Sequence, residues 1–191
     1  MGYDMQMLRQ PAPLPPDYEP QYADDPGYFR VVQHGMPVLS LFMFLAGVID
    51  EDEEGPAFPP WPPEGIADAQ RAEAILEAEN VAVPPVTESE RDAMRAWEAR
   101  ADVVRRTLSQ LPGRVPAFKF GLQMDWIVSE GEAQIIASGL RRALAETPEV
   151  FVDAVAQIPD AGLSGDEALA WIRRWMRFNE ISADNGGYRV S

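Results

Sequence analysis

The sequence predicts a mainly helical α+β fold, in which about five to six helices pack on one small sheet of short strands. Three S/T-x-x-E motifs precede stretches with helical apolar spacing, and such motifs cap the first turn of a helix. Short segments rich in aromatic and β-branched residues predict the strands. These segments are residues 2–7, 28–32, 126–129 and 188–190. Because they come from both ends of the chain, we expect residues 1–191 to form a single domain.

The N-terminal half, residues 1–85, is acidic and rich in proline. It contains fourteen of the 18 prolines, and its fifteen acidic residues and three arginines give a net charge of −12. Proline fixes φ and removes a backbone donor, so the proline-rich segments are expected to be irregular connectors. Between them, Pro37 can open an apolar helix over residues 37–49. This apolar run is shorter than the roughly 20 residues that span a bilayer, so we expect a buried helix. A weaker helical pattern covers residues 66–80.

The C-terminal half, residues 86–191, is predicted to hold the other helices. Its three capping boxes pair a hydroxyl with a glutamate three positions later, and they are Thr87 with Glu90, Ser129 with Glu132, and Ser164 with Glu167. After the first box, an apolar stripe is expected to face a core, and it consists of Met94, Trp97, Ala101, Val104 and Leu108. Pro148 is expected to separate two further helices. The helix after Ser164 is apolar on more than one face and should be the most buried.

Composition excludes several classes of function. The chain has no cysteine, which rules out disulfides and cysteine-ligated metal sites. His34 is the only histidine, so a two-histidine metal site is also excluded, and we expect no metal and no cofactor. The net charge of −15 opposes binding to nucleic acid and to acidic membranes. The first residues lack the pattern of a secretory signal, so we expect a cytoplasmic protein.

An acidic run followed by an aromatic, proline-rich segment is the candidate surface for a protein partner. Its members are Asp50, Glu51, Asp52, Glu53, Glu54, Phe58 and Trp61. Gly55 occupies the sixth position from Asp50, as in a calcium loop, but the twelfth position is Trp61 instead of glutamate. A solvated acidic loop is therefore the favoured interpretation. Aromatic side chains in such a loop would anchor a partner that the negative charge attracts.

A second candidate site surrounds Lys119, the only lysine of the chain. Lys119 and Asp125 flank a turn that precedes a helix N-terminus, with Trp126 beside them. A desolvated lysine can act as a nucleophile or base, and His34 could contribute an imidazole. The alternative is structural: Lys119 pairs with a neighbouring carboxylate, Trp126 anchors the core, and His34 has no catalytic partner. No nucleophile motif and no glycine-rich phosphate loop accompanies these residues.

Three stretches together resemble a family of uncharacterised actinobacterial and actinobacteriophage proteins. They are "MGYDM" (1–5), "KFGLQMDWIVSEGE" (119–132) and "NGGYRV" (185–190). The turn "GLQMD" departs from the more polar turn that the family pattern leads us to expect. The resemblance implies a shared fold and a host range, and it implies no activity.

The leading functional hypothesis is a small, non-enzymatic protein-interaction module that binds a basic protein partner. Phage-encoded inhibitors and bacterial immunity or antitoxin proteins are modules of this kind. The alternatives are an enzyme or small-ligand binder that uses Lys119 and Asp125, with His34, and a phage structural or assembly component. The oligomeric state stays open in each case.

Overall fold

The computed structural model describes residues 2–11, 13–16, 18–32, 35–50, 54–62, 87–121, 125–158 and 164–191. Its contacts divide the chain into two compact units. Unit 1 comprises Met1–Gly55 and Leu108–Ser191, and unit 2 comprises Pro56–Thr107. The helix expected over residues 66–80 lies outside the described residues. The single-domain organisation stays a prediction.

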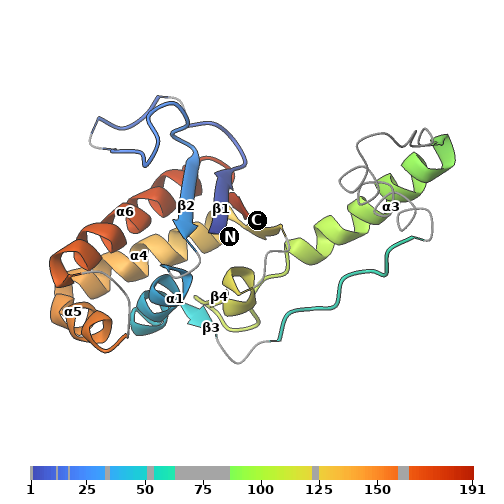
Figure 1. Cartoon of the computed structure of the whole chain (residues 1–191). Coiled ribbons are helices and arrows are strands. Elements are labelled where there is room, and N and C mark those ends of the chain that lie inside the picture. The colour runs from blue at the N-terminus through green and yellow to red at the C-terminus, as the bar shows by residue number, and fades with distance from the viewer. Residues whose placement is uncertain are drawn as a thin grey trace, which may run out of the picture. The chain divides into compact units, whose positions relative to one another are not determined.

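The main sheet of unit 1 is antiparallel and joins the two ends of the chain (Figure 1). Its strand order is β2-β1-β6-β5. The strands are β1 (Gly2–Met7), β2 (Tyr28–Val32), β5 (Trp126–Val128) and β6 (Tyr188–Val190). Val190 pairs with Met5 on one side and with Trp126 on the other, so the C-terminal strand lies inside the sheet. All four strands expected from the sequence are therefore confirmed.

Helices α4 (Glu130–Glu146) and α6 (Gly165–Asp184) run beside each other behind the sheet in the view of Figure 1. The ring of Phe29 on β2 lies 5.2 Å from the rings of both Trp175 and Phe178 on α6, which packs α6 on the sheet. Helix α5 (Pro148–Ala156) packs against α6. The predicted α+β, mainly helical fold is thus confirmed.

The capping boxes predicted from the sequence are present at all three helix starts. Thr87 caps α3 (Glu88–Arg105), Ser129 caps α4 and Ser164 caps α6. In each box the hydroxyl accepts a hydrogen bond from the glutamate backbone N–H, and the glutamate side chain accepts one from the capping residue. Local sequence therefore determines where these helices begin.

The apolar helix expected over residues 37–49 is shorter in the structure. Helix α1 covers Met36–Leu45, and Gly47 then adopts a φ of 66°. This left-handed residue turns the chain into strand β3 (Ile49–Asp50), which pairs in parallel with β4 (Val115–Pro116). The end of the apolar run is therefore a strand of a second, two-stranded sheet. Among the described residues, the helices are all too short or too polar to cross a membrane.

Helix α3 of unit 2 buries part of the expected apolar stripe. Trp97 and Ala101 are buried, and Arg105 lies on the same face. The helix ends at Arg105, so Leu108 lies beyond it and remains 58% exposed. The prediction that Leu108 belongs to the core is wrong, because a residue past the last turn no longer follows the helical spacing.

Candidate functional site

The acidic run that sequence analysis assigned to a partner is only partly described. Asp50 is the last residue of β3 and only 7% exposed, and its Oδ2 accepts a hydrogen bond of 3.0 Å from Ser109 Oγ. Its expected place in a solvated loop is therefore wrong, because Asp50 follows Ile49 in strand β3 and pairs with Pro116 of β4. Glu54 is exposed, as expected. The other three members lie outside the described residues: Glu51, Asp52 and Glu53.

The proline-rich segment that follows contacts α3 through two tryptophans. The rings of Trp61 and Trp97 stack with centroids 4.4 Å apart and planes inclined by 18°. The indole N–H of Trp97 donates a hydrogen bond of 2.9 Å to the carbonyl oxygen of Pro59. Trp97 is buried, whereas Trp61 stays 52% exposed. The buried ring thus supports one face of the exposed ring.

Arg105 completes this group, which we call the aromatic cluster: Phe58, Trp61, Trp97 and Arg105. The Arg105 guanidinium lies 6.0 Å from the ring centroid of Phe58 and 5.9 Å from that of Trp97, within the range of cation–π attraction. Arg105 also forms an ion pair with Glu98 on the same helix. Trp97 and Arg105 are buried and Phe58 is half-buried, so the cluster presents chiefly the Trp61 ring to solvent, where it can contact another molecule.

Sequence analysis found two members of the aromatic cluster and missed the other two. Phe58 and Trp61 were expected at a partner surface. Trp97 was expected in a core, and it is buried. Its stacking on Trp61 was missed because the two residues lie far apart in the chain. The helical spacing of Arg105 with Trp97, two turns earlier, is the signal that could have placed the arginine on the same face.

Lys119 lies entirely inside unit 1. It belongs to η2 (Ala117–Phe120) and is 0% exposed. Its Nζ donates hydrogen bonds to the Ile127 carbonyl oxygen at 2.7 Å and to Glu132 Oε1 and Oε2 at 2.7 and 2.8 Å. A protonated amine that donates three hydrogen bonds has no lone pair with which to attack a substrate. This geometry favours the structural alternative for Lys119.

Glu132 is both the partner of Lys119 and a member of the α4 capping box. Its Oε2 accepts hydrogen bonds from the Ser129 backbone N–H at 2.8 Å and from Ser129 Oγ at 2.9 Å. The carboxylate also acts on Tyr188, whose pKa is raised well above its usual value, first by burial and then by the charge of Glu132. One buried ion pair therefore connects η2, β5 and the start of α4.

Asp125 and Trp126 have different surroundings from Lys119. Asp125 has a φ of 56° and forms an ion pair with Arg189 at 3.8 Å, where both side chains are partly exposed. Trp126 is buried, and its ring lies 4.7 Å from that of Phe118. The structure thus brings Lys119 together with Glu132, and Asp125 together with Arg189. His34 lies outside the described residues.

The described part of the chain contains no cluster of His, Asp and Glu side chains that could hold a metal ion. It does contain a hollow on α6 that sequence analysis did not anticipate. The hollow has a volume of about 360 Å³. It is lined by Glu19, Ala170, Arg173, Arg174, Met176 and Arg177. The only sequence signal for it is the arginine-rich stretch "RRWMR" at 173–177.

No family model, curated protein or solved structure matches this chain. The resemblance to actinobacterial and phage proteins therefore stays a prediction. The described residues of its three stretches contribute β1, β6, the end of η2, β5 and the first turn of α4. Strands β1, β6 and β5 are neighbours in the sheet.

Proposed function

We propose that this protein is a non-enzymatic interaction module that binds a basic protein partner, in the manner of phage-encoded inhibitors and bacterial immunity proteins. The observation that carries the proposal is the half-exposed Trp61, which stacks on the buried Trp97. Tryptophan is enriched among the residues that dominate binding energy at protein interfaces. A ring held in place before binding loses little conformational entropy when it is covered.

Charge supports the choice of a basic partner. The chain carries a net charge of −15, of which −12 falls in residues 1–85. Charge of one sign accelerates encounters with a partner of the other sign and disfavours partners of like sign. The aromatic cluster would supply the contact area, and the regional charge would supply selection among partners.

The test compares three immobilised forms of the full chain: the wild type, Trp61→Ala and Tyr22→Ala. Tyr22 is a matched control because it is also a half-exposed aromatic residue in a ring pair, at 5.2 Å from Tyr28, but it belongs to unit 1. Proteins captured from an actinobacterial lysate are identified, purified and titrated against each form. We expect Trp61→Ala to weaken binding by at least about 30-fold, as the loss of a dominant anchor does, and Tyr22→Ala to leave it nearly unchanged.

The same titrations at low and high salt test the role of charge. Binding to a basic partner should weaken as ionic strength rises, because salt screens exposed charges. Equal affinities for the wild type and Trp61→Ala would remove the aromatic cluster from the interface. An affinity that does not change with salt would contradict a partner chosen by charge.

A further inference from the structure

Strand β2 lies at the edge of the main sheet, where β1 is its only neighbour among the described strands (Figure 1). An edge strand presents unpaired backbone N–H and C=O groups, to which a strand of another molecule can add. The sequence of β2, "YFRVV", favours such pairing, because every residue except Arg30 is aromatic or β-branched.

The register of the sheet directs the backbone of Arg30 toward this free edge. Arg30 lies opposite Asp4 of β1. The Asp4 backbone bonds in the other direction, because its N–H donates to the Ser191 carbonyl oxygen at 2.8 Å and its C=O accepts from the Ser191 N–H at 2.9 Å. Asp4 and Arg30 are therefore one of the pairs without mutual hydrogen bonds that alternate along an antiparallel ladder. The Arg30 N–H and C=O consequently point away from β1.

The side chain of Gln21 occupies both of these backbone groups. Its Oε1 accepts a hydrogen bond of 2.6 Å from the Arg30 N–H, and its Nε2 donates one of 3.1 Å to the Arg30 carbonyl oxygen. A neighbouring antiparallel strand would form the same two bonds at this position. The carboxamide thus takes the place of one residue of an added strand.

This glutamine belongs to a stretch that we call the edge segment, residues 18–26. The Tyr28 N–H, which faces the same edge, donates a hydrogen bond of 3.1 Å to the Asp25 carbonyl oxygen. The ring of Tyr22 lies 5.2 Å from that of Tyr28, as the side chains of paired strands do. The edge segment therefore covers two successive outward-facing positions of β2.

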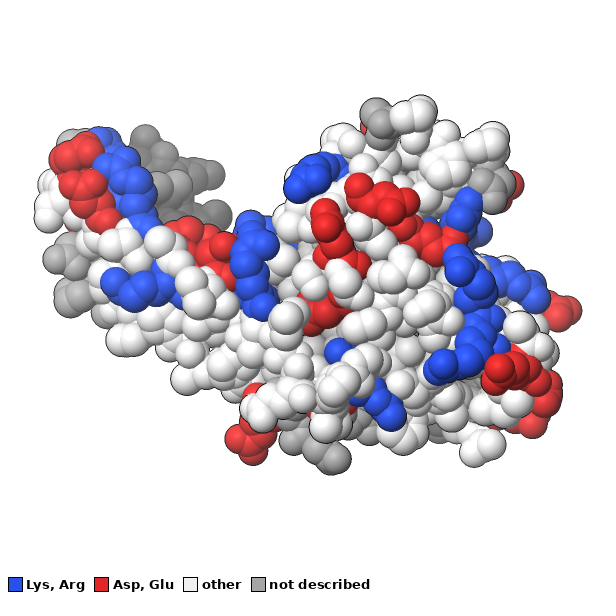
Figure 2. Space-filling model, turned by 180° about the vertical axis from the view of Figure 1, so that it is seen from behind, with Lys and Arg blue, Asp and Glu red and all other residues white. Residues whose placement is uncertain are grey.

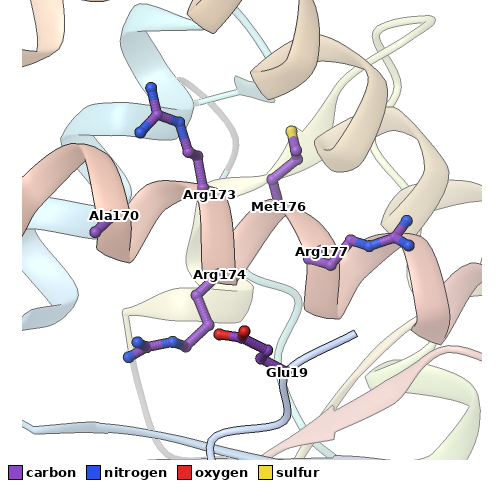
Figure 3. A pocket seen from close by; sticks show the side chains of 6 residues that line it. All are labelled: Glu19, Ala170, Arg173, Arg174, Met176 and Arg177. Atoms are coloured by element: carbon purple, nitrogen blue, oxygen red, sulfur yellow. The ribbon is translucent and has the colours of Figure 1, made fainter. Parts of the chain in front are cut away.

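The edge segment does not pack closely on α6 along its whole length. At Glu19 a hollow of about 360 Å³ lies between the segment and the helix. Figure 3 shows the Glu19 side chain beside Arg174, whereas Arg173 and Arg177 point in other directions. The attachment of the segment at this level therefore depends on its contacts with β2.

We propose that Gln21 is an edge cap, which prevents β2 from pairing with β2 of a second copy of the chain. Two identical edges can join about a two-fold axis, so every copy presents a matching strand. On the helical side of unit 1, acidic and basic side chains occur together, as on surfaces that keep proteins soluble (Figure 2). Strand β2 has a single charged residue, so the hydrogen bonds of Gln21 supply protection that charge does not. This role is independent of the aromatic cluster, which belongs to unit 2.

The experiment compares the wild-type full chain with Gln21→Ala and Gln10→Ala. Gln10 is the matched control because it lies in the same connection between β1 and β2, but its Nε2 donates to the Asp25 side chain at 3.2 Å instead of to β2. Sedimentation velocity at an ionic strength of about 0.15 M follows self-association. We expect Gln21→Ala to associate at concentrations at least about tenfold lower than the wild type and Gln10→Ala require.

Hydrogen exchange of the Arg30 amide, followed by NMR, locates the association. In dilute Gln21→Ala this amide has lost its acceptor, so its exchange should be at least about tenfold faster than in the wild type. As the concentration rises, pairing with a second copy should slow the exchange again. A purely local loss of structure would leave the exchange rate independent of concentration.

A proline at position 30 tests whether the edge itself is required. Arg30→Pro added to Gln21→Ala removes the outward N–H and should restore the weaker association of the wild type, because proline cannot donate to an added strand. Circular dichroism checks the folding of this double variant.

Three results would overturn the proposal. Equal self-association of the wild type and Gln21→Ala would show that Gln21 does not protect the edge. An increase of the same size in Gln10→Ala would attribute the effect to the connection in general. Fast exchange of the Arg30 amide in associated Gln21→Ala would place the contact away from β2, even if the proline variant failed to fold.

Discussion

Lys119 illustrates how one buried charge can be structural. Its ammonium and the Glu132 carboxylate are both removed from water, and removing two ions from water costs several kcal/mol that only close, hydrogen-bonded pairing can offset. We expect Lys119→Met to destabilise unit 1 by about 3–5 kcal/mol, because it leaves Glu132 charged and buried without its cation. Urea unfolding followed by circular dichroism measures this change.

A paired variant separates the loss of charge pairing from the loss of packing. Lys119→Met combined with Glu132→Gln removes both charges, and glutamine at this position can still complete the capping box. The double variant should be more stable than Lys119→Met alone. A double variant that is no more stable than Lys119→Met would show that Lys119 does not stabilise the protein through this ion pair.

Tyr18 supplies a prediction about alkaline pH. Burial raises its pKa to about 12, while the charge of Arg177 lowers it to a smaller extent. An unfolded tyrosine loses its proton near pH 10, so between about pH 10 and 12 the unfolded chain binds fewer protons than the folded chain. Stability should therefore fall as pH rises through this range. In Tyr18→Phe the fall should be less steep, and urea midpoints at about pH 8 and 11 measure the difference.

In the Tyr18→Phe variant, stability should still fall to some extent as pH rises, because burial also raises the pKa of Tyr188. The prediction therefore concerns the slope, which should decrease without vanishing. An unchanged slope would mean that Tyr18 titrates at the same pH in the folded and unfolded chains.

At the scale of elements, two adjacent glycines between α6 and β6 form a matched pair. Gly186 and Gly187 both have positive φ, 88° and 82°. An added Cβ on Gly187 would lie 2.0 Å from the Val128 carbonyl oxygen, which belongs to the neighbouring strand β5. On Gly186 its nearest contacts would be side-chain atoms of Arg9 and Leu8 at 3.4 Å. Only at Gly187 does the missing Cβ therefore allow two backbone segments to approach closely.

Alanine substitution should separate these two roles. Gly186→Ala should cost about 1–2 kcal/mol, the penalty of a left-handed conformation for a residue with a Cβ. Gly187→Ala adds a clash with a strand that cannot rotate away, and we expect more than about 4 kcal/mol. Thermal unfolding of both variants measures the difference. Similar losses of stability in the two variants would show that the positive φ alone determines the cost and that β5 can move to accommodate the added Cβ.

The elements that the sequence predicted correctly are those with a local chemical signal. The three hydroxyl-glutamate pairs determine helix starts because both partners lie within one turn. The apolar run over residues 36–49 lacked a comparable signal for its end. Gly47 turns the chain there, and only the partner strand at Val115 explains why the following residues are extended. That partner is far away in sequence.

At the scale of the whole molecule, pairing between distant segments limited what the sequence could predict. The strands themselves were recognised, but the insertion of β6 between β1 and β5 depends on contacts between both ends of the chain. The candidate sites follow the same rule. Lys119 was weighed together with Asp125, which is near in sequence, whereas its carboxylate partner is Glu132 at the start of the next helix.

The two compact units lead to a prediction about local stability. In unit 2, α3 buries few large apolar side chains, chiefly Trp97, whereas α6 buries Ile172, Trp175 and Phe178 in the core of unit 1. Segments with few buried apolar contacts open more readily. We expect the amides of α3 to exchange hydrogen at least about tenfold faster than those in the middle of α6. Hydrogen exchange followed by mass spectrometry measures both helices in one experiment.

The variant Trp97→Ala tests whether the units open independently. It removes the stacking on Trp61 and the hydrogen bond to Pro59, so exchange in α3 should accelerate. If unit 2 opens by itself, exchange in α6 should stay the same, because none of its contacts changes. Equal acceleration in both helices would instead mean that the chain opens as one cooperative body, as a single domain would.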